Sequence, residues 1–190
     1  MLRFAVIEIL PAAVFLVPVY LLLHKLYFRD ARRCGLCFLF SFYLCAVYAL
    51  VGLPNASYIR FDLSGNLIPF RDMLTGLRST VQNVLLFVPL GVFLPLLWKK
   101  YRMCRSTVRF GFCMSLAIEL LQIFTYRATD INDLITNTAG AFLGFLLARV
   151  AMRRFPGIAG TVQCKKDLLI VFMLPFIIMF FLYPVWIAIL

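Results

Sequence analysis

Six long apolar runs, separated by short charged stretches, constrain this 190-residue chain more than any other feature of its sequence. Each run is at or near the roughly 20 residues that an α-helix needs to cross the hydrocarbon core of a bilayer. Hydrophobic residues make up 64% of the chain, and they lack the period of a soluble amphipathic helix. The sequence therefore predicts an all-α, polytopic membrane helix bundle with six transmembrane helices, at about residues 4–27, 34–53, 81–98, 106–126, 133–151 and 168–189.

The basic residues are distributed unevenly among the connections between these runs. Fourteen of the 19 follow runs one, three and five: Lys25, Arg29, Arg32, Arg33, Lys99, Lys100, Arg102, Arg105, Arg109, Arg149, Arg153, Arg154, Lys165 and Lys166. The positive-inside rule places these connections in the cytoplasm and both termini outside. This topology, with attraction to anionic inner-leaflet lipid, explains the net charge of +11, so membrane lipids are expected partners and nucleic acid is not.

No linker or low-complexity tract divides the sequence, which predicts a single membrane domain over residues 1–190. The longest connection, residues 54–80, lies on the outer side in this topology. It brings Asn66 and Arg71 to that side, and Asn83 follows at the outer end of the third run.

The fourth run contains a polar stripe within an apolar helix. Glu119 lies about seven residues, or roughly 10 Å, from the outer end of the run. Ser115, Glu119 and Gln122 share one helical face. Ionisable groups at membrane depth are costly and are functional candidates by default. The alternative for Glu119 is a buried ion pair, with Arg127 for example, that only fixes helix packing.

The fifth run begins with a second polar face. Thr129 or Asp130 is a good helix N-cap, which offers a purely structural explanation for one of the two aspartates in this first turn. Capping does not explain Asn137, which lies one turn beyond Asp133 on the same face. The short connection makes runs four and five antiparallel neighbours, so their polar faces can meet. Gly140 and Gly144 continue this face, and we expect them to allow close approach of another helix.

These residues predict a polar cavity open to the outer side. Carboxylate and amide oxygens suit a divalent cation, and arginine suits phosphate or carboxylate. A desolvated Glu119 could also act as a general acid or base. The candidate catalytic residues are Glu119 and Asp133, and the candidate metal ligands are Glu119, Asp130 and Asp133. The candidate binding residues are Asn66, Arg71, Asn83, Gln122, Arg127, Asp130 and Asn137.

The same residues carry a resemblance to the VanZ-like family, whose core would span residues 60–150. The matching motifs are Asn66-Leu67-Ile68-Pro69-Phe70, Asn83-Val84-Leu85-Leu86-Phe87-Val88-Pro89-Leu90-Gly91, Ser115-x-x-x-Glu119-x-x-Gln122, and Arg127-x-x-Asp130-x-x-Asp133-x-x-x-Asn137-x-x-Gly140-x-x-x-Gly144. The resemblance implies a multi-pass protein of the bacterial cytoplasmic membrane, linked through the founding member to reduced susceptibility to teicoplanin-type glycopeptides.

Three functions stay open at this point. In the first, the outer-facing site binds a lipid-linked head group of the envelope or the head group of a peptidoglycan precursor. In the second, the protein is a membrane enzyme that performs acid–base or metal-assisted chemistry on an envelope lipid phosphate. The third is a small transporter or flippase, which the confinement of the polar groups to one side disfavours.

Overall fold

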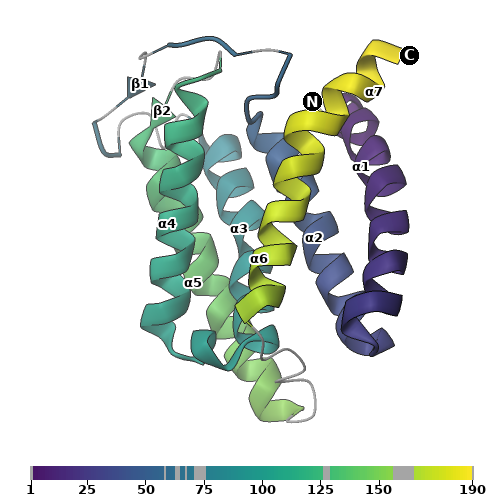
Figure 1. Cartoon of the computed structure of the whole chain (residues 1–190). Helices are drawn as coiled ribbons and strands as arrows, with labels where there is room; N and C mark the ends of the chain where they lie inside the picture. The colour runs from purple at the N-terminus through teal and green to yellow at the C-terminus, as the bar shows by residue number, and fades with distance from the viewer. Residues whose placement is uncertain are drawn as a thin grey trace. The chain divides into compact units, whose positions relative to one another are not determined.

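The computed structural model describes residues 2–57, 59–62, 65–66, 68–70, 76–125, 129–155 and 165–189, without the side chains of residues 2–11, 165 and 187–189. The described chain is almost entirely α-helical (Figure 1), which confirms the predicted fold class. Its helices are α1 (Leu2–Leu23), α2 (Ala31–Val51), α3 (Leu77–Leu97), α4 (Cys104–Gln122), α5 (Ile131–Arg154), α6 (Lys165–Ile177) and α7 (Tyr183–Ile189).

Each predicted apolar run forms one helix, except that the last run forms two. A π-helical segment (Ile178–Leu182) joins α6 to α7, and Pro175 lies just before it. Four stretches of the described chain are long and apolar enough to cross a membrane: Ala31–Val51, Leu77–Leu97, Ile131–Arg154 and Lys166–Trp186. A shorter apolar stretch, Ala12–Phe28, covers the end of α1. The number of spans and the outer position of the termini stay predictions.

Helix α4 is not among these four stretches, because three charged residues make it less apolar than the other long helices. Arg105 and Arg109 lie near its start, and Glu119 lies one turn from its end. Its polar residues nevertheless lie inward, since Ser115, Glu119 and Gln122 are buried.

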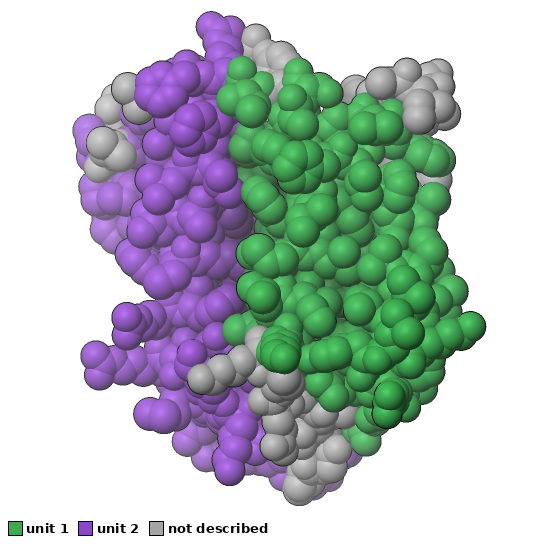
Figure 2. Space-filling model, in the orientation of Figure 1, with its two compact units in different colours: residues 1–59, 164–190 green, residues 60–163 purple. Residues whose placement is uncertain are grey.

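The chain divides into two compact units (Figure 2). Unit 1 comprises residues 1–59 and 164–190, and unit 2 comprises residues 60–163. Unit 1 therefore contains α1, α2, α6 and α7, whereas unit 2 contains α3, α4 and α5. The predicted single domain over 1–190 stays a prediction, and each unit is described by itself below.

In unit 1, buried polar contacts join α1, α2 and α6. The Tyr20 hydroxyl lies 2.6 Å from the Ser41 Oγ, which donates to the carbonyl of Val171 at 3.2 Å. Near the start of α6, Arg33 forms an ion pair with fully buried Asp167 at 2.6 Å, and the Tyr27 hydroxyl donates to the same carboxylate at 2.9 Å. The sequence analysis did not anticipate this acidic group among the basic connections.

In unit 2, α3 and α5 pack backbone to backbone through glycines. A Cβ added to Gly140 would meet the carbonyl oxygen of Val84, and one added to Gly144 would meet that of Val88. On the facing helix, a Cβ at Gly91 would meet the carbonyl oxygen of Ala141. The close approach expected from Gly140 and Gly144 is confirmed, and α3 is the helix that approaches.

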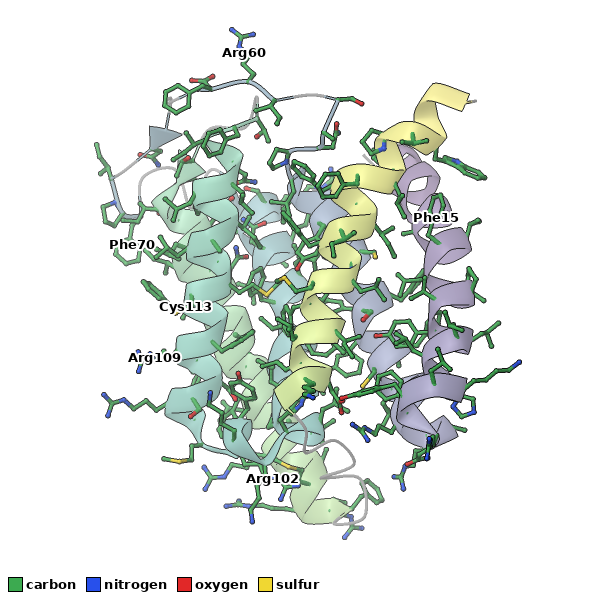
Figure 3. All side chains as sticks on the ribbon, in the orientation of Figure 1. Phe15, Arg60, Phe70, Arg102, Arg109 and Cys113 are labelled. Carbon is green, nitrogen blue, oxygen red and sulfur yellow. The ribbon has the colours of Figure 1, made fainter. Side chains whose placement is uncertain are left out.

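The two ends of unit 2 differ in composition. One end, here called the basic end, holds the 3₁₀ turn Lys99–Arg102, the start of α4 and the end of α5. The other end, here called the polar end, holds the starts of α3 and α5, the end of α4, and two short strands, β1 (Gly65–Asn66) and β2 (Thr129–Asp130). Figure 3 shows Arg102 and Arg60 at these opposite ends.

Candidate functional site

A parallel pair of two-residue strands organises the polar end of unit 2. Asn66 of β1 lies opposite Asp130 of β2, and its side-chain amide donates to the Asp130 carboxylate at 3.4 Å. The segment after β1 is held over the start of α5, because the backbone N–H of Phe70 donates to the Asn132 side chain at 2.7 Å. The long connection before α3 is thus tied directly to the predicted site.

Asp130 is the N-cap of α5, so the structure selects one of the two capping residues that the sequence offered. Its Oδ1 accepts from the backbone N–H of Asn132 at 2.9 Å. Its own backbone N–H donates to the Glu119 Oε2 at 2.9 Å. The Glu119 side chain is only 4% exposed, so a buried carboxylate of α4 holds the capping residue of α5. Hydrogen bonds to a carboxylate are shorter and stronger than those between neutral groups.

A second carboxylate–amide contact joins α3 to α5. The Asn83 side-chain amide donates to the Asp133 Oδ1 at 2.6 Å. Asn83 therefore bonds into the polar cluster, while Gly76 takes the N-cap position of α3. Asp133 also lies in the first turn of α5, where the helix dipole favours a negative charge.

Deeper in unit 2, Asn137 of α5 meets the polar face of α4. Its side-chain amide donates to the Ser115 Oγ at 3.0 Å, and both residues are buried. The Asn137 Oδ1 has no hydrogen-bond partner among the described residues. An unsatisfied buried acceptor is costly, so this oxygen is a place where a ligand donor would be favoured.

The predicted metal ligands are not gathered around one point. In the described part of the chain, no group of three or more His, Cys, Asp or Glu side chains is arranged to hold a metal ion. Local geometry gives the reason, since Glu119, Asp130 and Asp133 each turn toward a different partner in the contacts above. The structure instead joins three helices through paired carboxylates and amides.

Two predicted binding residues, Arg71 and Arg127, lie outside the described residues. Of the other predicted site residues, Asn66, Asn83, Glu119, Asp130, Asp133 and Asn137 take part in the contacts above, and Gln122 is buried on the same face of α4 as Glu119. The sequence analysis missed Asn132, which is 6% exposed and anchors the Phe70 backbone. The only local signal was its position two residues after Asp130, one of the predicted capping residues.

The chain is 37% identical over 109 residues to Protein VanZ of Enterococcus faecium, which corresponds to 56% of this chain and 62% of that protein. The chain thus matches less than two thirds of the relative's length. No solved structure matches the chain. The family model described as VanZ/LLP1 matches residues 13–152, most of the sequence, and the chain therefore belongs to the VanZ/LLP1 family.

Proposed function

We propose that this protein binds the head group of a lipid-linked cell-wall precursor at the outer face of the bacterial cytoplasmic membrane. One observation carries this proposal: a hydrogen-bonded group of buried and half-buried carboxylates and amides at one end of the three helices of unit 2. We further propose that this binding lowers susceptibility to teicoplanin-type glycopeptides, as the relationship to Protein VanZ suggests.

The charge distribution supports an outward-facing site. Lysines and arginines gather at the basic end of unit 2, which the positive-inside rule assigns to the cytoplasm. The polar end then faces the cell wall, where lipid-linked precursors are exposed. In the described part of unit 2 the carboxylates and side-chain amides lie at this one end, which favours a binding site over a path that crosses the membrane.

The chemistry of the polar end suits a head group that carries both donors and anionic oxygens. The Asn137 Oδ1, which no described residue bonds, and the carboxylates of Glu119 and Asp133 would receive hydroxyl, amide or ammonium donors. Arg71 and Arg127 belong to the same outer connections in the predicted topology, and arginine is the preferred partner of pyrophosphate and peptide carboxylate.

Mass spectrometry of lipids that copurify with the protein tests this proposal. We expect wild-type protein from bacterial membranes to retain a pyrophosphate-linked precursor. Asn137→Ala should retain at least about tenfold less, since a buried hydrogen bond to a charged group contributes about 1.5–3 kcal/mol. Thr138→Ala is the matched control, because its hydroxyl bonds only to the Leu134 carbonyl of its own helix in the contacts found. Thermal unfolding of each variant verifies that it is folded.

Equal precursor retention in wild type and Asn137→Ala, or retention of bulk phospholipid alone, would overturn the binding proposal. Glu119→Gln then separates binding from catalysis. Its amide oxygen can still accept the Asp130 N–H, so binding without turnover predicts that the precursor and the teicoplanin phenotype both persist. Retention of the precursor with loss of the phenotype would instead assign Glu119 a chemical role.

A further inference from the structure

A groove between α1 and α2 in unit 1 has no part in the site described above. It has a volume of about 360 Å³ and lies at the corner where α1 ends and α2 begins. This volume is in the range of small-molecule sites. Its apolar walls include Val17, Leu21 and Phe38. Val17 and Leu21 are 44% and 62% exposed, so the groove opens to the surface of the unit.

Gly35 forms an open part of this groove. A Cβ added at Gly35 would lie more than 4 Å from every atom of the described residues outside its own stretch of helix, in contrast to the glycines that pack α3 against α5. The lack of a side chain at Gly35 therefore leaves open space beside α2, and no other helix packs closely against this position in the described structure. Space of this kind, lined by aliphatic and aromatic side chains, suits a hydrocarbon chain.

The connection between α1 and α2, residues 24–30, lies next to the groove and is polar and basic. His24 lines the groove, and its Nδ1 has no hydrogen-bond partner among the described residues. Lys25 and Arg29 follow His24 along the corner, and both side chains are exposed. The adjacent acidic residue, Asp30, caps α2 through the backbone N–H of Arg32. An apolar groove that ends at exposed cations complements a lipid with an acyl chain and a negatively charged head group.

We propose that this groove binds an anionic phospholipid, with one acyl chain along Val17, Gly35 and Phe38 and the phosphate near Lys25 and Arg29. The predicted topology places this corner at the cytoplasmic leaflet, where anionic lipids attract basic side chains. The bound lipid fills the space at Gly35 and supplies the corner with a counter-charge. This site is independent of the function proposed for unit 2.

Native mass spectrometry of the full-length protein tests the groove. The protein is released from vesicles of equal parts phosphatidylglycerol and phosphatidylcholine, and the retained lipids are counted. We expect preferential retention of phosphatidylglycerol, and loss of this retention in Gly35→Phe, whose ring fills the groove. Leu39→Phe is the matched control, because Leu39 lies one turn further along α2, is 50% exposed and does not line the groove.

The charge requirement has a separate test. Lys25→Gln and Arg29→Asn should each lower the preference for phosphatidylglycerol by about fivefold, the contribution of one basic residue near an anionic surface. Asn is chosen because Arg29 has a φ of 55°, a conformation that asparagine tolerates. Lys99→Gln with Lys100→Gln removes exposed charge from unit 2 and should leave the preference unchanged.

Equal retention of both lipids by the wild type would show only ordinary boundary lipid and would overturn the proposal. So would undiminished phosphatidylglycerol retention by Gly35→Phe, or an equal fall in preference for the Lys99 and Lys100 control. Circular dichroism after release from the vesicles confirms that each variant has kept its helices, so a loss of lipid cannot arise from unfolding.

Discussion

Gly144→Ala and Gly35→Ala should change stability in opposite directions, although both replace a helical glycine by alanine. Such a change in a helix interior ordinarily stabilises by about 0.5–1 kcal/mol. At Gly35 the new methyl meets no atom within 4 Å, so this gain is kept. At Gly144 the new methyl group would overlap the Val88 carbonyl oxygen and lie 2.9 Å from the Cα of Gly91.

These neighbours of Gly144 are backbone atoms, which cannot rotate away as a side chain can. Helices α3 and α5 must separate, at a cost in the upper half of the usual 1–3 kcal/mol for overpacking. After subtraction of the helix-propensity gain, Gly144→Ala should lose about 1–2 kcal/mol. The separation would also stretch the hydrogen bond between Asn83 and Asp133, which joins the same two helices.

Thermal unfolding in detergent, followed by circular dichroism, measures this difference. In a chain of this size 1 kcal/mol corresponds to about 2–4 °C in Tm. We therefore expect Gly144→Ala to melt about 2–8 °C below wild type and Gly35→Ala to melt slightly above it. Shifts of equal sign and size at the two positions would refute the assigned packing of α3 against α5.

Two further predictions concern the ion pair in unit 1 and the topology. Arg33→Leu should destabilise by about 3–5 kcal/mol, because it leaves the fully buried Asp167 carboxylate without its cation. The double variant Arg33→Leu with Asp167→Leu should recover most of that loss in the same unfolding assay. A double variant as unstable as Arg33→Leu alone would contradict the assigned ion pair. In a background with the six native cysteines replaced, a membrane-impermeant maleimide should label Met103→Cys only from the cytoplasm and Phe70→Cys only from outside. Labelling of both from one side would overturn the orientation assigned to unit 2.

The helical content was predictable because it depends on local information. Hydrocarbon offers no hydrogen bonds to the backbone, so a long apolar run has to satisfy its peptide groups within a helix. The predicted runs accordingly match the observed helices to within a few residues. A helix N-cap at Thr129 or Asp130 and the close approach at Gly140 and Gly144 were also local inferences. The structure places the cap at Asp130 and confirms the close approach.

The partners of the site residues were not predictable in this way. Asn66 meets Asp130 through a pairing of two-residue strands far apart in the chain, and strands this short leave no pattern in the sequence. The contact of Asn83 with Asp133 depends on which helix packs against α5. Asp167 is a lone acidic residue among basic ones in the sequence, and only its contacts with Arg33 and Tyr27 reveal a buried ion pair.

The sequence by itself thus determined that this protein is a helical membrane protein. It also determined which polar residues interrupt the apolar runs, because hydrophobicity and helical periodicity act over a few turns. Only the tertiary structure decided that Glu119 holds the cap of α5 and that Asn83 holds Asp133. It also decided that no described residue bonds to the Oδ1 of Asn137. Each of these depends on the approach of separate helices, which backbone contacts at glycines and the strand pairing of β1 with β2 determine together.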